Sequence, residues 1–481
     1  MRIFCVILIL IHFGFPSYPQ KQNHRPNIVL IIADDVSAED LGCYGNDRIK
    51  TPSIDQLANE GIRFDNAYLT TSSCSPSRCS IISGRYPHST GAAELHTPLP
   101  YSVIPFPLLL KDSGYYTAQA GKWHMGASVH RAFDRYTDNN GYDNGEGGED
   151  KWVRFLRERP KNKPFFFWLA SLDAHRPWGA GKFAITHRPS DVLVPVYLSD
   201  DDSTRLDIAS YYNEIARFDH YVGQVVKELK MQGVLDNTLI LIIADNGRPF
   251  PRSKTRLYDS GIRTPFIVHW PNGVLDNRGS STSSLVSTID IAPTFLALAG
   301  VSAPPGFQGM SFAPILMDTM IKTRGIVYAE HNWHDYEAYE RMVRTSDFLY
   351  IYNGRPNLTN CGPVDSKTSV AQRVLNRLRD NGQLTAAQTD IFASPRPVEE
   401  LFDVKRDPHQ LVNIALEENY KERLNKMREL LKIWQHETGD TEPRNLTPDW
   451  FNRETGEALN GEQKRGTMPG RPVSTLNGIG M

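Results

Sequence analysis

The stretch PNIVLIIADD, residues 26–35, joins an apolar run to two adjacent carboxylates. The run is uninterrupted from Ile28 to Ala33, which is typical of a strand buried on both faces of a parallel sheet. The segment TPSIDQLANEGIRF, residues 51–64, then predicts a helix with Pro52 in its first turn. A buried strand followed by a helix is the repeating unit of an α/β sheet.

Similar strand-like runs recur along the chain, with helical patterns between them. They lie at 115–121, 163–173, 238–246 and 264–270, and the longest helical pattern covers about residues 203–232. This alternation predicts an α/β fold in which helices sandwich a large, mostly parallel central sheet.

The composition changes after about residue 345. FLYIYNG (348–354) and VEELFDV (398–404) predict short strands, and NYKERLNKMRELLKIWQHE (419–437) predicts an amphipathic helix with one apolar stripe. We therefore expect a smaller α+β subdomain, built from a short antiparallel sheet plus a helix, to follow the α/β domain.

These patterns divide the chain into four parts. The α/β domain covers residues 23–345 and the C-terminal α+β subdomain residues 346–440. Residues 441–481 are rich in Gly, Pro, Asn and Arg without periodicity, and form either a loose tail or a loop packed on the body. Residues 1–22 have the layout of a signal peptide, with one arginine followed by the apolar run of MRIFCVILILIHFGF.

The predicted signal peptide indicates a secreted or periplasmic protein, or a lysosomal or extracellular one in a eukaryote. Its apolar run is too short to span a bilayer, and no membrane span is expected elsewhere. The chain carries 53 basic and 55 acidic residues, a net charge of −2, so its overall charge favours no nucleic-acid partner. Once the signal is removed four cysteines remain, at positions 43, 74, 79 and 361, too few for a disulfide-built scaffold.

Acidic pairs follow two of the predicted strands. Asp34 and Asp35 end the first run, and Asp245 and Asn246 end the run at 238–246. Because the carboxyl ends of parallel strands form the binding edge of such sheets, these side chains could converge there. Three carboxylates and an amide oxygen suit Ca²⁺ or Mg²⁺. The alternative is that each pair only forms a turn.

The stretch SCSPSRCSIISG, residues 73–84, predicts a helix with Pro76 in its first turn and Gly84 as its stop. Cys74 then lies at the helix N-terminus with Arg78 one turn along, an arrangement that can cradle a sulfate or phosphate group. Three fates are open for the thiol: a disulfide with Cys79, attack on a substrate, or conversion to another group.

Residues 74–84 resemble the signature of the type I sulfatases, C-x-P-S-R-x-x-x-[LI]-[ST]-G, at every specified position. The resemblance extends from PNIVLIIADD to ELFDVKRDPHQLVNI and covers most of residues 26–437. In this formylglycine-dependent family of the alkaline-phosphatase-like superfamily, a formylglycine-generating enzyme oxidises the signature cysteine to Cα-formylglycine. The resemblance implies that Cys74 is the modified residue and that Pro76 and Arg78 belong to the recognition sequence of that enzyme.

The resemblance also implies the residues around Cys74. The expected ligands of one Ca²⁺, with Mg²⁺ the less fitting ion, are Asp34, Asp35, Asp245, Asn246 and the hydrate of residue 74. The other expected site residues are the sulfate ligands Arg78, Lys122 and Lys254, the hydrate's partner His124 and the general acid His175. The stretch YPHSTGAAELHTPLP, residues 86–100, resembles the sulfamidase-like branch, in which His96 would meet the substrate ring.

The function implied is a sulfatase that removes sulfate from a carbohydrate, through attack of a hydrate hydroxyl on sulfur. N-sulfated glycosaminoglycan fragments and sulfated algal polysaccharides such as ulvan or carrageenan remain open as substrates. Two alternatives remain: a phosphonate or phosphodiester hydrolase of the same superfamily, and an inactive protein that binds sulfated glycans. The first usually shows extra metal-binding histidines, which are not found here.

Overall fold

The computed structural model describes residues 25–137, 148–178, 186–359 and 362–472. The predicted signal peptide lies outside these residues. Within the described ranges, no helix has the length and apolar composition that a bilayer crossing requires.

The centre of the molecule is an eight-stranded sheet in the order β4-β3-β5-β1-β6-β7-β2-β8. Only β7 runs antiparallel to its neighbours, so the expected large and mostly parallel sheet is confirmed. Its strands are β1 (Asn27–Ala33), β2 (Ile62–Tyr68), β3 (Tyr116–Gly121), β4 (Arg135–Tyr136), β5 (Phe165–Ala170), β6 (Thr238–Ala244), β7 (Phe266–His269) and β8 (Ser280–Ser287).

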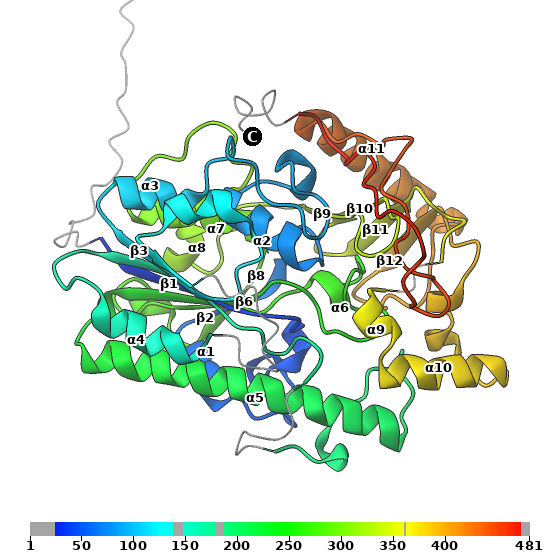
Figure 1. Cartoon of the computed structure of the whole chain (residues 1–481), viewed down its shortest axis with the longest axis horizontal. Coiled ribbons are helices and arrows are strands. Elements are labelled where there is room, and N and C mark those ends of the chain that lie inside the picture. The colour runs from blue at the N-terminus through cyan, green and yellow to red at the C-terminus, as the bar shows by residue number, and fades with distance from the viewer. Residues whose placement is uncertain (1–24, 138–147, 179–185, 360–361, 473–481) are drawn as a thin grey trace, which may run out of the picture.

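Helices cover both faces of this sheet (Figure 1). One face carries α2 (Cys74–Ser83), α3 (Phe106–Asp112), α7 (Ile291–Leu298) and α8 (Ala313–Met317), and the other carries α1 (Pro52–Glu60), α4 (Asp150–Glu158) and α5 (Asp202–Met231). Successive side chains of β1 point alternately towards the two layers of helices. Ile28, Leu30 and Ile32 pack towards α2 and α3, whereas the odd-numbered Val29 and Ile31 pack towards α1 and α5. Burial on both faces explains why this run is continuously apolar.

The C-terminal subdomain is built on a four-stranded antiparallel sheet in the order β12-β11-β10-β9, as Figure 1 shows. The strands are β9 (Val327–His331), β10 (Glu340–Arg344), β11 (Phe348–Asn353) and β12 (Glu399–Asp403), and the helix α11 (Lys421–Thr438) packs on them. The apolar stripe of α11, Leu424, Met427, Leu431 and Trp434, is buried against the sheet. The expected short antiparallel sheet plus helix is therefore confirmed.

Two strands of this small sheet come from before residue 345. β9 and β10 each carry buried charged side chains, such as Glu330 and Arg341, which lie 3.6 Å apart. Charged residues in a buried strand obscure the apolar pattern by which strands are recognised. The sequence therefore placed the boundary at the change of composition, whereas the small sheet already begins at Val327. The helices α6 (Asp259–Ile262), α9 (Val364–Lys367) and α10 (Val370–Asp380) lie in the connections.

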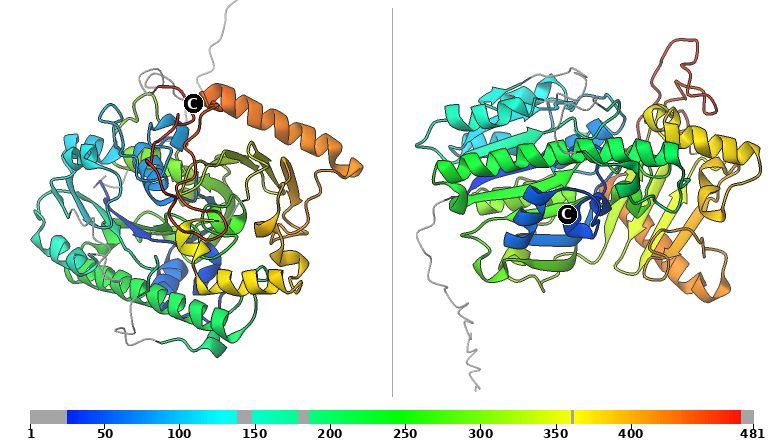
Figure 2. Two further views of the ribbon diagram at one scale, coloured as in Figure 1. Left: turned by 45° about the vertical axis from the view of Figure 1, so that its right-hand side comes forward. Right: turned by 90° about the horizontal axis from the view of Figure 1, so that it is seen from below.

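The described part of the C-terminal segment, residues 441–472, runs back over the body of the protein, and one loop of it stands out from the surface (Figure 2). Thr447 is buried and donates to the Glu94 carboxylate, and Arg465 pairs with the same carboxylate at 2.8 Å. Trp450 contacts Trp333, with ring centroids 4.3 Å apart. Of the two forms expected for this segment, its described residues adopt the packed loop.

Candidate active site

Four side chains gather at the carboxyl ends of two adjacent strands. β1 and β6 are parallel neighbours in which Ala33 pairs with Ala244, so the residues that follow them leave the sheet at the same edge. Asp34, Asp35, Asp245 and Asn246 are all fully buried there. Asn246 Nδ2 donates to Asp35 Oδ1 at 2.7 Å and to Asp245 Oδ1 at 3.0 Å.

Cys74 is the first residue of α2 and points into this group. Its Sγ lies 3.2 Å from Asn246 Nδ2 and 3.9 Å from Asp34 Oδ1. Burial raises the pKa of the Cys74 thiol to about 12, so the thiol stays protonated at neutral pH. Within the described part of the chain Cys74 and Cys79 are both free cysteines. The disulfide between them, one of the three alternatives for the Cys74 thiol, is therefore not formed. A protonated, buried thiol is also a poor nucleophile.

Arg78 lies one turn into α2 and pairs with Asp245. Its Nε is 2.7 Å from Asp245 Oδ2, and both side chains have no exposed surface. Burial alone would lower the pKa of Arg78, but Asp245 and Asp34 outweigh it and raise the pKa, so the guanidinium is charged. Among the described residues, its buried Nη2 has no hydrogen-bond partner. Arg78 therefore keeps an unused donor within the site.

Two buried lysines bring further positive charge. Lys122, just after β3, pairs with Asp34, and Lys254 Nζ donates to Asp35 Oδ2 at 2.7 Å. Burial opposes their ionisation, but the neighbouring carboxylates Asp34 and Asp35 outweigh it and raise the pKa of both lysines. Three cations and three carboxylates thus lie together in one buried group.

The three predicted histidines lie beside this group of charges. His124 Nε2 and His96 Nδ1 are 2.7 Å apart, and both line a pocket of about 220 Å³ together with Trp123. Burial, reinforced by Lys122, holds the pKa of His124 well below its usual value, so His124 is neutral. His175 lies on the Lys254 side, with its Nε2 4.0 Å from Asp35 Oδ2.

The structure adds residues of the C-terminal subdomain that no sequence motif marked. Asp365, in α9, accepts from Lys254 Nζ at 2.9 Å and lies 3.6 Å from His175 Nε2. His334 Nδ1 lies 2.7 Å from the hydroxyl of Ser73, the residue that precedes Cys74. Both residues stand in segments without recognisable spacing, so only their position in the fold reveals them.

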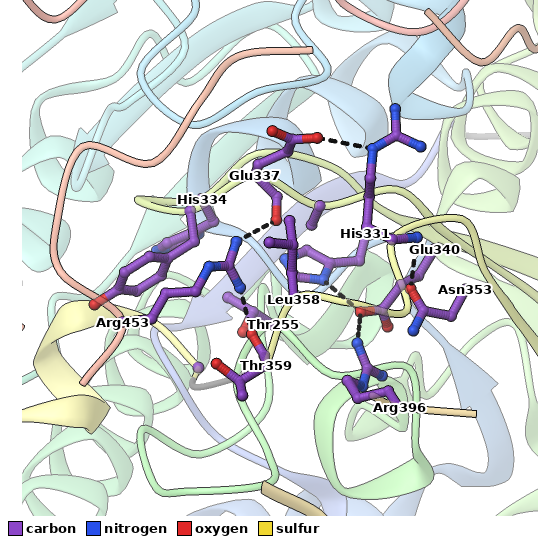
Figure 3. Close-up of a pocket in the computed structure, with 14 residues that line it drawn as sticks. Thr255, His331, His334, Glu337, Glu340, Asn353, Leu358, Thr359, Arg396 and Arg453 are labelled. Carbon is purple, nitrogen blue, oxygen red and sulfur yellow. Dashed lines mark hydrogen bonds and ion pairs between the residues drawn. The ribbon is translucent and has the colours of Figure 1, made fainter. Parts of the chain in front are cut away.

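A second pocket separates the loop after β6 from the small sheet (Figure 3). It begins at Thr255, next to Lys254, and His334 forms part of its wall. Two ion pairs join residues of its wall: Arg396 Nη1 is 2.6 Å from Glu340 Oε1, and Arg355 Nε is 2.7 Å from Glu337 Oε1. This pocket adjoins the candidate site through Thr255, which follows Lys254 in the chain, and through His334, which contacts Ser73.

The group at the sheet edge fits a divalent cation. Asp34, Asp35 and Cys74 offer ligand atoms that all lie within 4.8 Å of one another. The Oδ1 atom of Asn246 is buried and has no hydrogen-bond partner among the described residues, although a buried acceptor normally has one. Carboxylate and amide oxygens are the ligands that hard cations prefer. An ion at this edge would bind the carboxylates, and turning the Asn246 amide would bring its Oδ1 to the place of the Nδ2 that faces them.

Comparison with known proteins places this arrangement in a family. The model of the family described as Sulfatase matches residues 26–301, more than half of the chain. The chain belongs to the sulfatase family. A second model, described as N-sulphoglucosamine sulphohydrolase, C-terminal, matches residues 252–351. Members of the family generally use a formylglycine and a divalent metal, and this sulfatase is accordingly a sulfuric ester hydrolase.

Two relatives and one solved structure illustrate the similarity. An ulvan-active sulfatase of Formosa agariphila is 31% identical over 87% of this chain and 76% of that protein. The human N-sulphoglucosamine sulphohydrolase is also 31% identical, over 86% of this chain and 91% of that protein. A solved complex of a protein with its substrate D-glucosamine-2-N,6-O-disulfate has a TM-score of 0.68 and 23% identity, over 86% of this chain and 98% of that one. The last likeness shows the shared fold.

Proposed function

We propose that this sulfatase removes sulfate from a sulfated carbohydrate, as an O-sulfate ester or an N-sulfate, with Cys74 as the precursor of its nucleophile. The observation that carries the proposal is the convergence of Asp34, Asp35, Asp245 and Asn246 on Cys74, surrounded by three cations. A sulfate monoester is an anion that water attacks slowly. Its hydrolysis therefore needs positive charge and a positioned nucleophile.

The four residues at the sheet edge would hold one calcium ion. Three carboxylates and one amide oxygen suit Ca²⁺, which accepts many oxygen ligands in variable geometry, better than the strictly octahedral Mg²⁺. When bound, the ion would supply a Lewis acid beside residue 74 and the sulfate. Turning the Asn246 amide would give its orphaned Oδ1 the ion as a partner, in place of the Nδ2 that faces Asp35 and Asp245.

We infer that a formylglycine-generating enzyme converts Cys74 during maturation. The hydrate of formylglycine would supply one hydroxyl to attack sulfur and a second through which sulfate is later expelled. An unmodified thiol at this position is buried and protonated, so it offers little nucleophilic character. This contrast supports conversion of Cys74 over direct attack by its thiol.

Arg78, Lys122 and Lys254 would bind the sulfate oxygens and offset the charge that develops in the transition state. All three are buried, and charges in a water-excluded pocket act more strongly than the same charges in water. Their positions on α2, after β3 and after β6 would place positive charge around the group.

Two histidines would move protons. The neutral His124 can accept a proton from residue 74. His175 Nδ1 lies against the backbone carbonyl of Arg176, so its Nε2 is the nitrogen turned towards the site. We assign His175 as the acid that protonates the departing sugar oxygen or nitrogen.

A carbohydrate substrate is supported by the relatives and by the pocket beside His124. The named activities of the relatives concern ulvan and N-sulphoglucosamine. The pocket of about 220 Å³ combines Trp123 with His96 and His130, and aromatic and polar groups together suit a sugar ring. We therefore keep His96 as a substrate contact.

The test is co-expression with a formylglycine-generating enzyme, followed by mass spectrometry of the peptide that contains residue 74. Sulfate release is then measured over a panel of defined N- and O-sulfated oligosaccharides, with Cys74→Ala as the control. We expect formylglycine in the wild type and release from at least one sugar of the panel. A peptide that retains only the thiol, or faster turnover of aryl phosphate than of aryl sulfate, would contradict the proposal.

A further inference from the structure

Lys254 is held by two carboxylates from different domains. Its Nζ lies 2.7 Å from Asp35 Oδ2 in the α/β domain and 2.9 Å from Asp365 Oδ2 in the C-terminal subdomain. The Lys254 side chain is 1% exposed and that of Asp365 is 20% exposed. The ammonium group therefore sits between an inner carboxylate and an outer one, at the junction of the two domains.

The two carboxylates that hold Lys254 differ in the other groups that they can bind. Asp35 belongs with Asp34 and Cys74 to the group at the sheet edge that could hold a metal ion, and Asp365 belongs with Asp35 and His175 to a second group of that kind. In the proposed function Asp35 is a metal ligand, so an ion and an ammonium would share its oxygens. Asp365 is not one of the four residues proposed to hold the ion, so it can bind Lys254 without competition from that ion.

Asp365 is itself firmly placed. Its Oδ1 accepts the backbone N–H of Ser366 at 2.5 Å, and the neighbouring N–H of Val364 donates to Asp335 Oδ2 at 3.0 Å. Burial alone would raise the pKa of Asp365, but Lys254 and His175 outweigh it and hold the pKa well below its usual range. The outer carboxylate is thus both fixed and charged.

Lysine needs such an anchor more than arginine does. Its ammonium is a compact charge at the end of a flexible four-carbon stem, with no rigid fork to set its direction. An ammonium held by Asp35 alone would compete with a cation for that carboxylate. A second, outer carboxylate draws the ammonium away from the metal ligands.

We propose that Asp365 is a positioning residue that holds Lys254 in the sulfate pocket while Asp35 serves the metal. The active site is then completed by the C-terminal subdomain. This inference rests on the proposed function, and Asp365 acts through Lys254 instead of touching the sulfate. If the Asp365–Lys254 pair were only structural, Asp365 would stabilise the domain interface, but the effect of its loss on kcat/KM would not depend on Lys254.

The test is a double-mutant cycle on kcat/KM with Asp365→Asn, Lys254→Met and the double variant. Removing one group that stabilises an oxyanion commonly lowers the rate about 100- to 1000-fold, so we expect a loss of that order for Lys254→Met. We expect Asp365→Asn to lower kcat/KM about 10- to 100-fold by misplacing Lys254. In the Lys254→Met background the same change should matter less than about twofold on an aryl sulfate with a good leaving group, which needs no proton from His175, the other neighbour of Asp365. Asp365→Glu, which keeps the charge, should restore part of the loss.

A matched control comes from the same loop and the same subdomain. Arg252 Nε pairs with Asp390 Oδ2 at 2.7 Å, which also joins the loop after β6 to the C-terminal subdomain. Asp390→Asn should leave kcat/KM within about twofold of the wild type. An equal loss in Asp390→Asn and Asp365→Asn would assign both pairs to the interface and overturn the proposal.

A binding measurement separates this inference from the proposed function. Calorimetry with inorganic sulfate on the Cys74→Ala variant, in calcium, needs no turnover. Asp365→Asn should weaken sulfate binding about tenfold in that background and leave it unchanged when Lys254 is methionine. If the wild type releases no sulfate, the proposed function fails, and the binding series still tests Asp365. Independent effects of the two substitutions, wild-type behaviour of Asp365→Asn, or no sulfate binding at all would each refute the positioning role.

Discussion

Replacing Asp245 with asparagine should destabilise the protein strongly, because Arg78 would remain charged and buried without its carboxylate. The pair is 2.7 Å long and neither side chain has exposed surface. At an effective dielectric constant of about 20, two unit charges at 2.7 Å attract by about 6 kcal/mol. Part of this attraction offsets desolvation, so breaking such a pair from one side costs about 3–5 kcal/mol.

The assay is urea unfolding in EDTA, so that no metal contributes, for Asp245→Asn, Arg78→Met and the double variant. Each single change leaves one buried charge uncompensated, whereas the double change leaves none at this pair. We expect the loss in the double variant to be smaller than the sum of the single losses by about 3 kcal/mol or more. Arg188→Met is the control, since the Arg188 side chain is 80% exposed in its pair with Asp191. This substitution should leave the midpoint nearly unchanged.

Additive losses in the double variant would refute this reasoning, because they would mean that the two charges do not stabilise each other. A loss for Asp245→Asn no larger than that of one neutral hydrogen bond, about 1 kcal/mol, would do the same. Either result would also mean that buried charges at this site interact no more strongly than charges at the surface.

Three further outcomes are expected. Dialysis against EDTA should abolish sulfate release and lower the thermal midpoint, and added Ca²⁺ should restore both more fully than Mg²⁺; restoration by neither ion would argue against a metal at the sheet edge. His175→Gln should slow release from sugar sulfates about 100- to 10,000-fold but affect aryl sulfates with good leaving groups far less, because the latter need no acid; equal losses on both would remove the acid role. Burial alone would lower the pKa of His88, yet Glu330 and Asp440 raise it above its ordinary value of 6.5. Its stabilisation is therefore complete below that value and is lost as the pH rises through the raised pKa. The difference in unfolding midpoint between wild type and His88→Gln should shrink from about pH 5 to about pH 9, and a constant difference would contradict this.

Much of the fold follows from local patterns in the sequence. The apolar run from Ile28 to Ala33 predicts a strand buried on both faces, and β1 has that position between β5 and β6. The acidic pairs at 34–35 and 245–246 come together because β1 and β6 are parallel and in register. The signature at 74–84 marks Cys74 and Arg78 by spacing within a single helix. In each case the information lies within one segment or at the end of one strand.

Only the tertiary structure shows the features that depend on ion pairs between residues far apart in the sequence. β9 and β10 escaped recognition because their polar residues, such as Glu330 and Arg341, are neutralised by partners that sequence spacing does not show. Asp365 carries no motif, and it reaches Lys254 from 111 positions along the chain. A carboxylate becomes part of a site only through what lies within a few ångströms of it. Hydrophobic periodicity in the sequence indicates which face of a strand or helix is buried. Which charged side chains pair with one another depends on the folded chain.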